Sequence, residues 1–181
     1  MFRTILTRAL LPLAAAVALL APAARAQQGP ALAVTAENRT AAAEASAGRA
    51  RRDDRARPGD LLRYRLTFTN SSGRALRGVT LADPIPAGLA LVAGSPRTAR
   101  TDARLEYSAD RGVTWSAQPM EEVVVNGQRV RRAVPAERYT HVRWTVAGSV
   151  APGATVVAEF DARVTAGSQS PPPPAAPRPR R

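Results

Sequence analysis

The chain of 181 residues has room for one ordinary domain with tails, and its formal net charge is +12, from 26 basic and 14 acidic residues. Every basic residue is arginine, and there is no cysteine, which excludes a disulfide framework, a cysteine nucleophile and a thiolate metal site. Aromatic residues make up only 4% of the chain and no recognition motif is present, so the positive charge does not predict nucleic-acid binding.

The N-terminus has the three parts of a secretory signal. A short basic region precedes the apolar run 9–21, and the small-x-small motif 24–26 predicts cleavage between Ala26 and Gln27. The apolar run is shorter than the roughly 20 residues that span a bilayer, so we expect no transmembrane segment in the mature chain. Cleavage lowers the net charge from +12 to +9. The segment 1–26 therefore predicts export to the periplasm, the cell surface or the medium.

Residues 27–57 combine a weak edge strand with a linker. The strand is expected at 31–36, where small and apolar residues alternate. From 37 to 57 the chain turns to Ala, Arg, Asp and Glu, with six arginines against four acids. A helical turn at 41–45 is an alternative, but the stretch has no apolar stripe, so a solvated linker is the prediction.

The body of the chain, 58–165, reads as an all-β domain. Leu62, Tyr64, Leu66 and Phe68 alternate with Arg63, Arg65, Thr67 and Thr69, which is the period of a strand with one buried face. No segment has a helical period over ten residues. Asn126-Gly127 is a strong hairpin signal, and Gly112 predicts a second tight turn. Further strands are expected at 76–81, 88–92, 105–108, 113–115, 123–125, 128–130, 142–146 and 156–164.

The tail, 166–181, holds a proline-rich run and ends in Arg178, Arg180 and Arg181. Proline at this density predicts a stiff, disordered appendage with no core to bury. Two interpretations remain open. The tail is either a terminal linker without a partner or a spacer that presents the three arginines to an anionic polymer of the envelope.

Two motifs in the body resemble a known family. The segments R-P-G-D-L-L-R-Y-R-L-T-F-T-N-S-S-G at 57–73 and L-A-D-P-I-P-A-G-L at 81–89 resemble the bacterial conserved-repeat family catalogued as domain of unknown function number eleven. The resemblance implies an immunoglobulin-like antiparallel β-sandwich over about 58–165, in secreted or surface proteins, with no established enzymatic role. This chain carries one copy. The matching positions are Pro58, Gly59, Asp60, Tyr64, Asn70, Gly73, Asp83, Pro86, Gly88 and Leu89.

The motif residues have structural explanations. Gly59 and Gly73 allow turn geometry that side chains forbid, and Asn70 can bond the backbone of its own turn. We expect Asp83 to accept hydrogen bonds from backbone amides in its corner, which Pro84 and Pro86 stiffen.

No catalytic or cofactor site is predicted. His141, the one histidine, is expected beside a strand, without an orienting partner. The serines lack a nucleophile-elbow motif, and the adjacent acids Asp53-Asp54 and Glu121-Glu122 point apart in an extended chain. Asp102, Asp110 and Asp161 lack the ligand spacing of a calcium loop, although a loop-borne calcium site stays open.

The predicted function is a non-enzymatic, exported module with a structural or adhesive role at the cell envelope. Its partners would be other envelope or surface proteins, contacted through a sheet face or edge. The alternative is binding of anionic envelope polymers through the arginine-rich tail and linker. Four arginines, Arg63, Arg65, Arg143 and Arg163, are expected on wet faces, where their charge would keep sheet edges from pairing between molecules.

Overall fold

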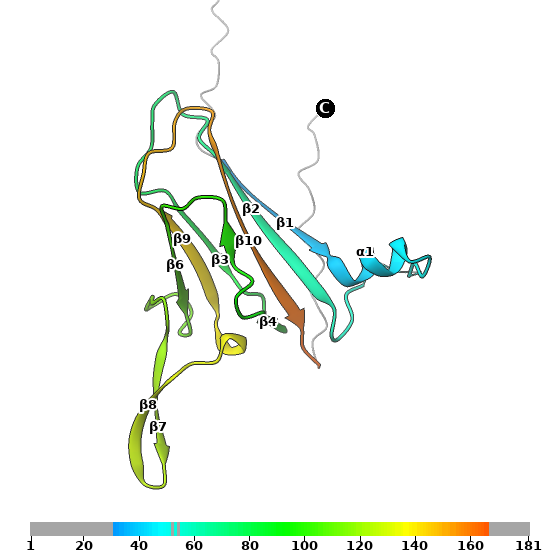
Figure 1. Cartoon of the computed structure of the whole chain (residues 1–181), viewed down its shortest axis with the longest axis vertical. Helices are drawn as coiled ribbons and strands as arrows, with labels where there is room; N and C mark the ends of the chain where they lie inside the picture. Colours follow the sequence, from blue (N-terminus) through cyan, green and yellow to red (C-terminus); the bar gives the residue numbers. More distant parts are fainter. Residues whose placement is uncertain (1–30, 52, 54, 167–181) are drawn as a thin grey trace, which may run out of the picture.

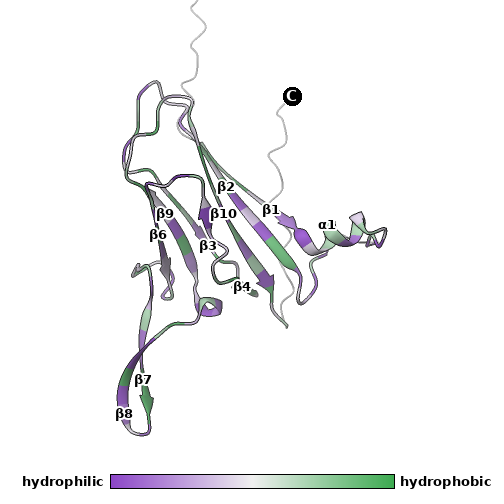
Figure 2. Ribbon diagram, viewed as in Figure 1, coloured by the Kyte–Doolittle hydropathy of each residue, from purple (hydrophilic) through white to green (hydrophobic). Residues whose placement is uncertain are grey.

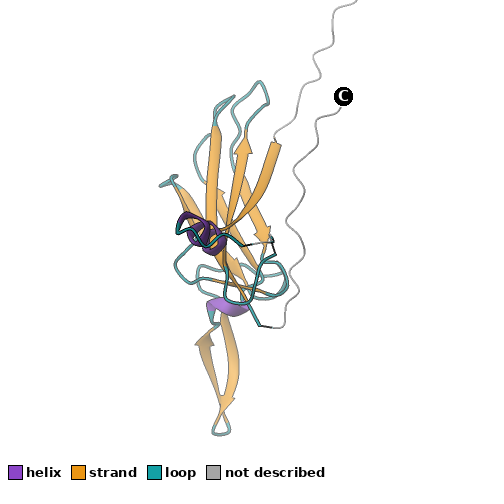
Figure 3. Cartoon of the chain, turned by 90° about the vertical axis from the view of Figure 1, so that its right-hand side faces the viewer, coloured by secondary structure: helices purple, strands orange, loops and turns teal. Residues whose placement is uncertain are grey.

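A computed structural model describes residues 31–51, 53 and 55–166 of the chain. Strands dominate these residues and every strand pairing is antiparallel, which confirms the all-β prediction. Within the described part, helix is confined to α1 (Arg39–Ser46) and the short 3₁₀ turn η1 (Ala136–Arg138). Figure 3 shows the strands running mostly along the long axis of the molecule, with α1 in front of them.

The larger sheet is built around the longest strand, β10 (Thr155–Val164). Its order is β1-β2-β10-β4, and β5 also pairs with β10. β10 places Phe160 opposite Tyr64 of β2, and Val156 opposite Phe68. The other strands are β1 (Ala31–Asn38), β2 (Leu61–Thr69), β4 (Leu89–Leu91) and β5 (Arg97–Thr98).

The smaller sheet has three strands in the order β3-β9-β6. These are β3 (Thr80–Pro84), β9 (His141–Val146) and β6 (Ala103–Ser108). The central strand β9 alternates strictly, because Val142, Trp144 and Val146 are buried while the residues between them are only partly covered.

The hydrophobic core lies between these two sheets. Trp144 of the smaller sheet and Phe160 of the larger sheet have ring centroids 6.4 Å apart, and both rings are almost fully buried. Tyr64 stacks on Phe160 at 5.0 Å, and Phe68 packs at the edge of the same cluster. Tyr64, Phe68, Trp144 and Phe160 therefore form an aromatic group in the core, together with Leu66, Leu81, Leu91 and Val156.

A third element, the hairpin of β7 (Met120–Val125) and β8 (Gln128–Ala133), pairs with neither sheet. It projects away from the rest of the chain in Figure 1. Asn126 and Gly127 have φ values of 51° and 80°, the left-handed pair that a tight two-residue hairpin turn requires. At its base, the Val134 amide donates to the Pro119 carbonyl at 2.9 Å, and both residues are buried.

The solvated-linker prediction for 37–57 is wrong for its first part. The edge strand continues to Asn38, and α1 follows at once. The Asn38 side chain caps the helix by accepting from the Ala41 amide at 2.9 Å. α1 buries no side chain, so no apolar stripe holds it. Its Asn38 cap, its alanine-rich composition and the polar contacts of Thr40 with the Leu61 amide and of Glu44 with Arg51 hold it instead.

Two predicted strands also differ from the structure. The strand expected at 76–81 begins at Thr80, and Leu76 makes only an isolated bridge to Val150. The strand expected at 113–115 does not form, since Tyr107 pairs there only with Ser116, in a single bridge. In both cases the residues lie in turns and loops, although their apolar character had predicted paired strands.

Candidate functional site

The most densely bonded polar site lies at Asp60, in the first motif. Its carboxylate is 3% exposed and accepts from both terminal nitrogens of Arg51, at 2.5 and 2.7 Å. It also accepts from the Asn38 side chain at 2.8 Å and the Arg57 amide at 2.9 Å. These donors, led by the Arg51 guanidinium, hold the pKa of Asp60 well below its usual range. Asp60 thus ties the N-terminal strand and helix to the domain.

Arg51 also bonds Glu44 of α1 at 2.5 Å, although its own side chain is only 8% exposed. The hydrogen bonds to Asp60 and Glu44 raise the pKa of Arg51. The hydrogen bond from Arg51 lowers the pKa of Glu44. Sequence reasoning missed this set of contacts and placed Arg51 in a solvated linker. A signal was present, because Asn38 precedes an alanine-rich run in the manner of a helix N-cap.

The second motif contains Asp83, whose carboxylate lacks the hydrogen-bond donors that surround Asp60. Oδ2 of Asp83 is buried without a hydrogen-bond partner, so the prediction that it accepts from backbone amides in the corner is wrong for this atom. Asp83 shares the inner face of β3 with Leu81, and burial raises its pKa to about 6. Burial, followed by the charge of Asp83, raises the pKa of the Tyr64 hydroxyl.

The other motif residues have mixed outcomes. Asn70, which is fully buried, bonds its own turn as expected: it donates to the Arg74 carbonyl at 2.8 Å and accepts from the Ser72 amide at 3.1 Å. It also donates to the Val150 carbonyl at 2.8 Å. Gly73 lacks the positive φ that we expected of it, whereas Gly59 has a φ of 89°. Pro86 lies in the corner, where its carbonyl accepts from the Leu89 amide at 3.0 Å.

Ser108, Asp110 and His141 come together at the end of β6, but not as a proton relay. The Ser108 hydroxyl is fully buried and donates directly to Asp110 at 2.7 Å. Nδ1 of His141 lies 3.1 Å from the Thr140 hydroxyl, and the imidazole meets the Trp115 ring edge-on at 6.0 Å. The Thr114 hydroxyl and amide and the Ser108 hydroxyl lower the pKa of Asp110 to about 2. The three residues build a turn.

The three acids considered for calcium each have another partner. Asp102 bonds Arg100 with both oxygens at 2.7 Å, Asp161 bonds Arg63, and Asp110 bonds the turn just described. Across residues 31–51, 53 and 55–166, no group of three or more His, Cys, Asp or Glu side chains could hold a metal ion.

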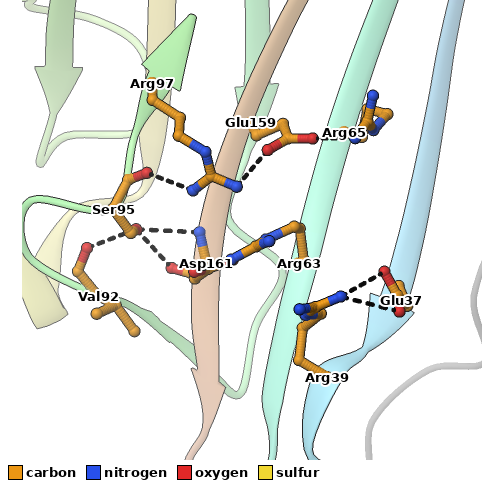
Figure 4. A network of polar contacts seen from close by, with 9 residues as sticks. All are labelled: Glu37, Arg39, Arg63, Arg65, Val92, Ser95, Arg97, Glu159 and Asp161. Atoms are coloured by element: carbon orange, nitrogen blue, oxygen red, sulfur yellow. Dashed lines mark hydrogen bonds and ion pairs between the residues drawn. The ribbon is translucent and has the colours of Figure 1, made fainter. Parts of the chain in front are cut away.

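A network of ion pairs covers the outer face of the larger sheet (Figure 4). Arg63 forms a two-pronged pair with Asp161, at 2.8 and 2.9 Å. One row away, Glu159 binds both Arg65 and Arg97. Arg63 lowers the pKa of Asp161, and the hydrogen bond to Asp161 raises the pKa of Arg63.

This network corrects the role expected for the arginines on the wet faces. Arg63, Arg65, Arg143 and Arg163 all lie on interior strands, with a neighbour on each side, so they guard no sheet edge. Three of them, Arg63, Arg65 and Arg143, bridge neighbouring strands instead. Arg163 donates to the Gly59 carbonyl at 3.0 Å, in the turn before β2. On the smaller sheet, Arg143 bonds the buried Glu106 at 2.9 Å, and its guanidinium lies 4.2 Å from the centre of the Trp115 ring.

The projecting hairpin is the most exposed apolar part of the described chain. Six large apolar side chains are exposed in the described residues; four of them lie on the hairpin, and a fifth, Val113, precedes it. Val124 is 68% exposed, at the tip of β7. Figure 2 shows hydrophobic colour toward that tip and hydrophilic colour along β8. The other four are Val113, Met120, Val125 and Val130.

Several predicted residues lie outside the described part of the chain. These are the cleavage site Ala26 and Gln27, and the tail arginines Arg178, Arg180 and Arg181. In the part that the structure describes, no helix has the length and apolar character needed to cross a membrane.

Comparison with family models, curated proteins and solved structures found no match to this chain. The resemblance to the conserved-repeat family therefore stays a prediction. The fold and surface define the class: an all-β protein of two facing antiparallel sheets with a projecting hairpin.

Proposed function

We propose that this chain is an exported, non-enzymatic, immunoglobulin-like β-sandwich module with a structural or adhesive role at the bacterial cell envelope. It works by contacting other envelope or surface proteins through its projecting hairpin. The observation that carries the proposal is that β7 and β8 stand clear of both sheets while bearing most of the exposed apolar side chains. Exposed apolar side chains gathered in one place mark contact surfaces.

The rest of the molecule suits a rigid support for such a contact. The outer face of the larger sheet is covered by cross-strand ion pairs. The cluster of Asp60, Arg51 and Asn38 fastens the N-terminal segment to the larger sheet. The hairpin offers a different surface, with unpaired strand edges and valine side chains. Addition of a strand from a partner to such an edge is a recurrent mode of recognition.

The proposal is tested by site-specific crosslinking in intact cells. We expect the chain to be processed, to fractionate with the envelope, and to crosslink to other proteins from a cysteine at Val124 (V124C). The matched control is T35C, on the exposed outer face of the larger sheet, which should give few adducts. Cytoplasmic retention, or equal adducts from both positions, would contradict the proposal, as would turnover of an envelope substrate by the purified protein.

A second candidate is binding of anionic envelope polymers, favoured by the excess of basic residues. The linker offers fewer free guanidinium groups than its composition suggests, because Arg51 is bound to Asp60 and Glu44. The tail would therefore carry this activity. Binding through arginines weakens steeply as salt rises, so binding that is unchanged by salt, or by removal of residues 166–181, would exclude this candidate.

A further inference from the structure

The two edges of the hairpin differ in charge. β8 has the sequence Q-R-V-R-R-A, with Arg129, Arg131 and Arg132 along it, whereas β7 ends in three consecutive valines. Charged side chains on a strand edge discourage pairing, and β-branched residues favour it. The arginines of β8 therefore protect its edge against pairing with another strand, whereas the valines at the tip of β7 leave that edge open to pairing.

Backbone geometry leaves hydrogen-bonding groups free at that tip. Val125 faces Gln128 across the two-residue turn, so this pair is bonded within the hairpin. The direction of backbone groups alternates along a strand, so the N–H and C=O of Val124 and Glu122 point away from β8. β7 thus presents free donors and acceptors beside its most exposed apolar side chain.

We infer that the β7 edge is a self-association surface, which pairs antiparallel with β7 of a second copy of this chain. The inference rests on the hairpin being the contacting element, as proposed above, and it adds a second copy of this chain to the partners proposed there. In the register that matches apolar residues best, Val124 faces Val124 of the second copy, and Val123 faces Val125. The two hairpins then form one four-stranded sheet around a two-fold axis, and the assembly closes as a dimer.

Packing favours this register. Side chains directly opposite on an antiparallel pair share one face, so Val123 and Val130 lie on the same side of the hairpin as Val125. The paired sheet joins these three valines to the same three of the second copy, making one patch of valines. Cross-strand pairs of β-branched side chains stabilise a sheet, and a sheet of four strands is far more stable than a lone hairpin.

Charge also favours the β7 edge over the alternative. Pairing through β8 would bring three arginines of each copy together along one seam, and like charges facing each other destabilise a sheet. In the β7 register, Glu122 faces Asn126 of the second copy. The two Glu122 residues are then offset by four positions, about 14 Å along the strand, which exceeds the screening length of about 8 Å at physiological salt.

The test uses purified mature chain in analytical ultracentrifugation. We expect a concentration-dependent dimer whose dissociation constant rises at least tenfold in V124R. V113R is the matched control, because Val113 is 78% exposed but lies outside the hairpin, and it should leave the dimer unchanged. Circular dichroism of each variant separates loss of pairing from loss of folding.

Crosslinking with a short bis-thiol reagent fixes the register, since the chain has no cysteine of its own. V124C should give covalent dimers, whereas V113C and R131C should not. A chain that stays monomeric at high micromolar concentration would overturn the inference. Dimers linked through R131C, or weakened equally by V113R, would overturn it as well. If the chain is monomeric but V124C still captures envelope proteins in cells, self-association is excluded while the proposed contact function stands.

Discussion

The carboxylates of Asp60 and Asp83, one in each of the segments 57–73 and 81–89, have opposite surroundings. Asp60 is surrounded by donors from Arg51, Asn38 and Arg57, whereas Oδ2 of Asp83 has no partner. The same residue type therefore contributes in opposite senses to stability. Asp60 favours the folded state when it is ionised, and Asp83 disfavours the folded state when it is ionised.

Substitution of Asp83 by asparagine should stabilise the protein at neutral pH. The folded-state pKa of Asp83, about 6, lies above its unfolded value of 3.8, so the wild-type chain loses stability as the pH rises through this window. Because part of the side chain reaches solvent, we expect D83N to raise the free energy of unfolding by about 1–2 kcal/mol at pH 8. The gain should vanish below pH 4, as measured by urea denaturation at both pH values.

D110N is the matched control for that experiment, with the opposite sign. In the wild-type chain, hydrogen bonds from Thr114 and Ser108 stabilise the ionised carboxylate of Asp110 and lower its pKa to about 2. Asparagine at this position should destabilise the protein at neutral pH. A D83N variant that is less stable than wild type at pH 8 would contradict the interpretation that the ionised Asp83 carboxylate disfavours the folded state.

Substitution of Asp60 by alanine should be strongly destabilising, because it leaves the Arg51 guanidinium without its main partner. We expect a loss of about 3 kcal/mol in the free energy of unfolding. The pKa of Asp60 is lowered in the folded state, so its contribution is complete above about pH 4 and is lost as the pH falls further. Equal stability of D60A and wild type at pH 7, in denaturant titrations, would show that the cluster does not anchor the N-terminal segment.

At the scale of elements, the hairpin and the sheets depend on different interactions. The core strands are held by long-range packing around Trp144 and Phe160. β7 and β8 are held by their own turn, by the contact of Val134 with Pro119 at the base, and by one exposed ion pair at 2.6 Å between Glu121 of β7 and Arg138 of η1. An isolated hairpin of two strands is only marginally stable in water. The hairpin should therefore be separable from the domain.

Replacement of residues 120–133 by a short Gly-Ser loop should leave the two sheets intact. We expect the melting temperature to change by only a few degrees and the far-ultraviolet spectrum to keep its β character, because Pro119 and Val134 remain in place. The same variant should lose self-association in analytical ultracentrifugation. Collapse of the domain on this replacement would mean that the hairpin is part of the folding unit.

The sequence was sufficient to predict elements whose signals are local. Period-two alternation located the strands at 61–69, 142–146 and 156–164, and Asn126-Gly127 located the projecting hairpin. Pairing between strands distant in sequence has no such signal. Nothing local indicates that Arg51 reaches Asp60, or that Asp83 loses every donor for one oxygen, because both depend on how the chain packs.

At the scale of the whole molecule, two arginines on the interior strands of the two sheets are less exposed to solvent than the arginines on the projecting hairpin. Arg63 and Arg143 lie on interior strands and are held by buried acids, whereas Arg129 and Arg131 lie on an exposed strand of the two-stranded hairpin, which we expect to open more readily. Since the chain contains arginine and no lysine, trypsin cleaves it at arginine alone. Proteolysis therefore reports directly on which part of the fold opens first.

Brief trypsin treatment of the dilute chain should cut the hairpin before it cuts the sheets. We expect early fragments ending at Arg129, Arg131 or Arg132, with cleavage at Arg63 and Arg143 much later, followed by mass spectrometry over time. Raising the protein concentration should slow hairpin cleavage if β7 pairs between copies. Simultaneous cleavage at interior and hairpin sites would contradict the separation of the two parts.

The order of strands in the larger sheet has a consequence for biogenesis. β10 is the last described strand to leave the ribosome, yet it binds β2, β4 and β5, so the sheet lacks its middle until synthesis has passed residue 164. A nascent chain that ends before that point lacks β10, so its larger sheet is incomplete and its apolar core residues stay exposed to water. Under the export proposed above, such an incompletely folded chain would pass through a narrow translocation pore and would complete its fold on the far side.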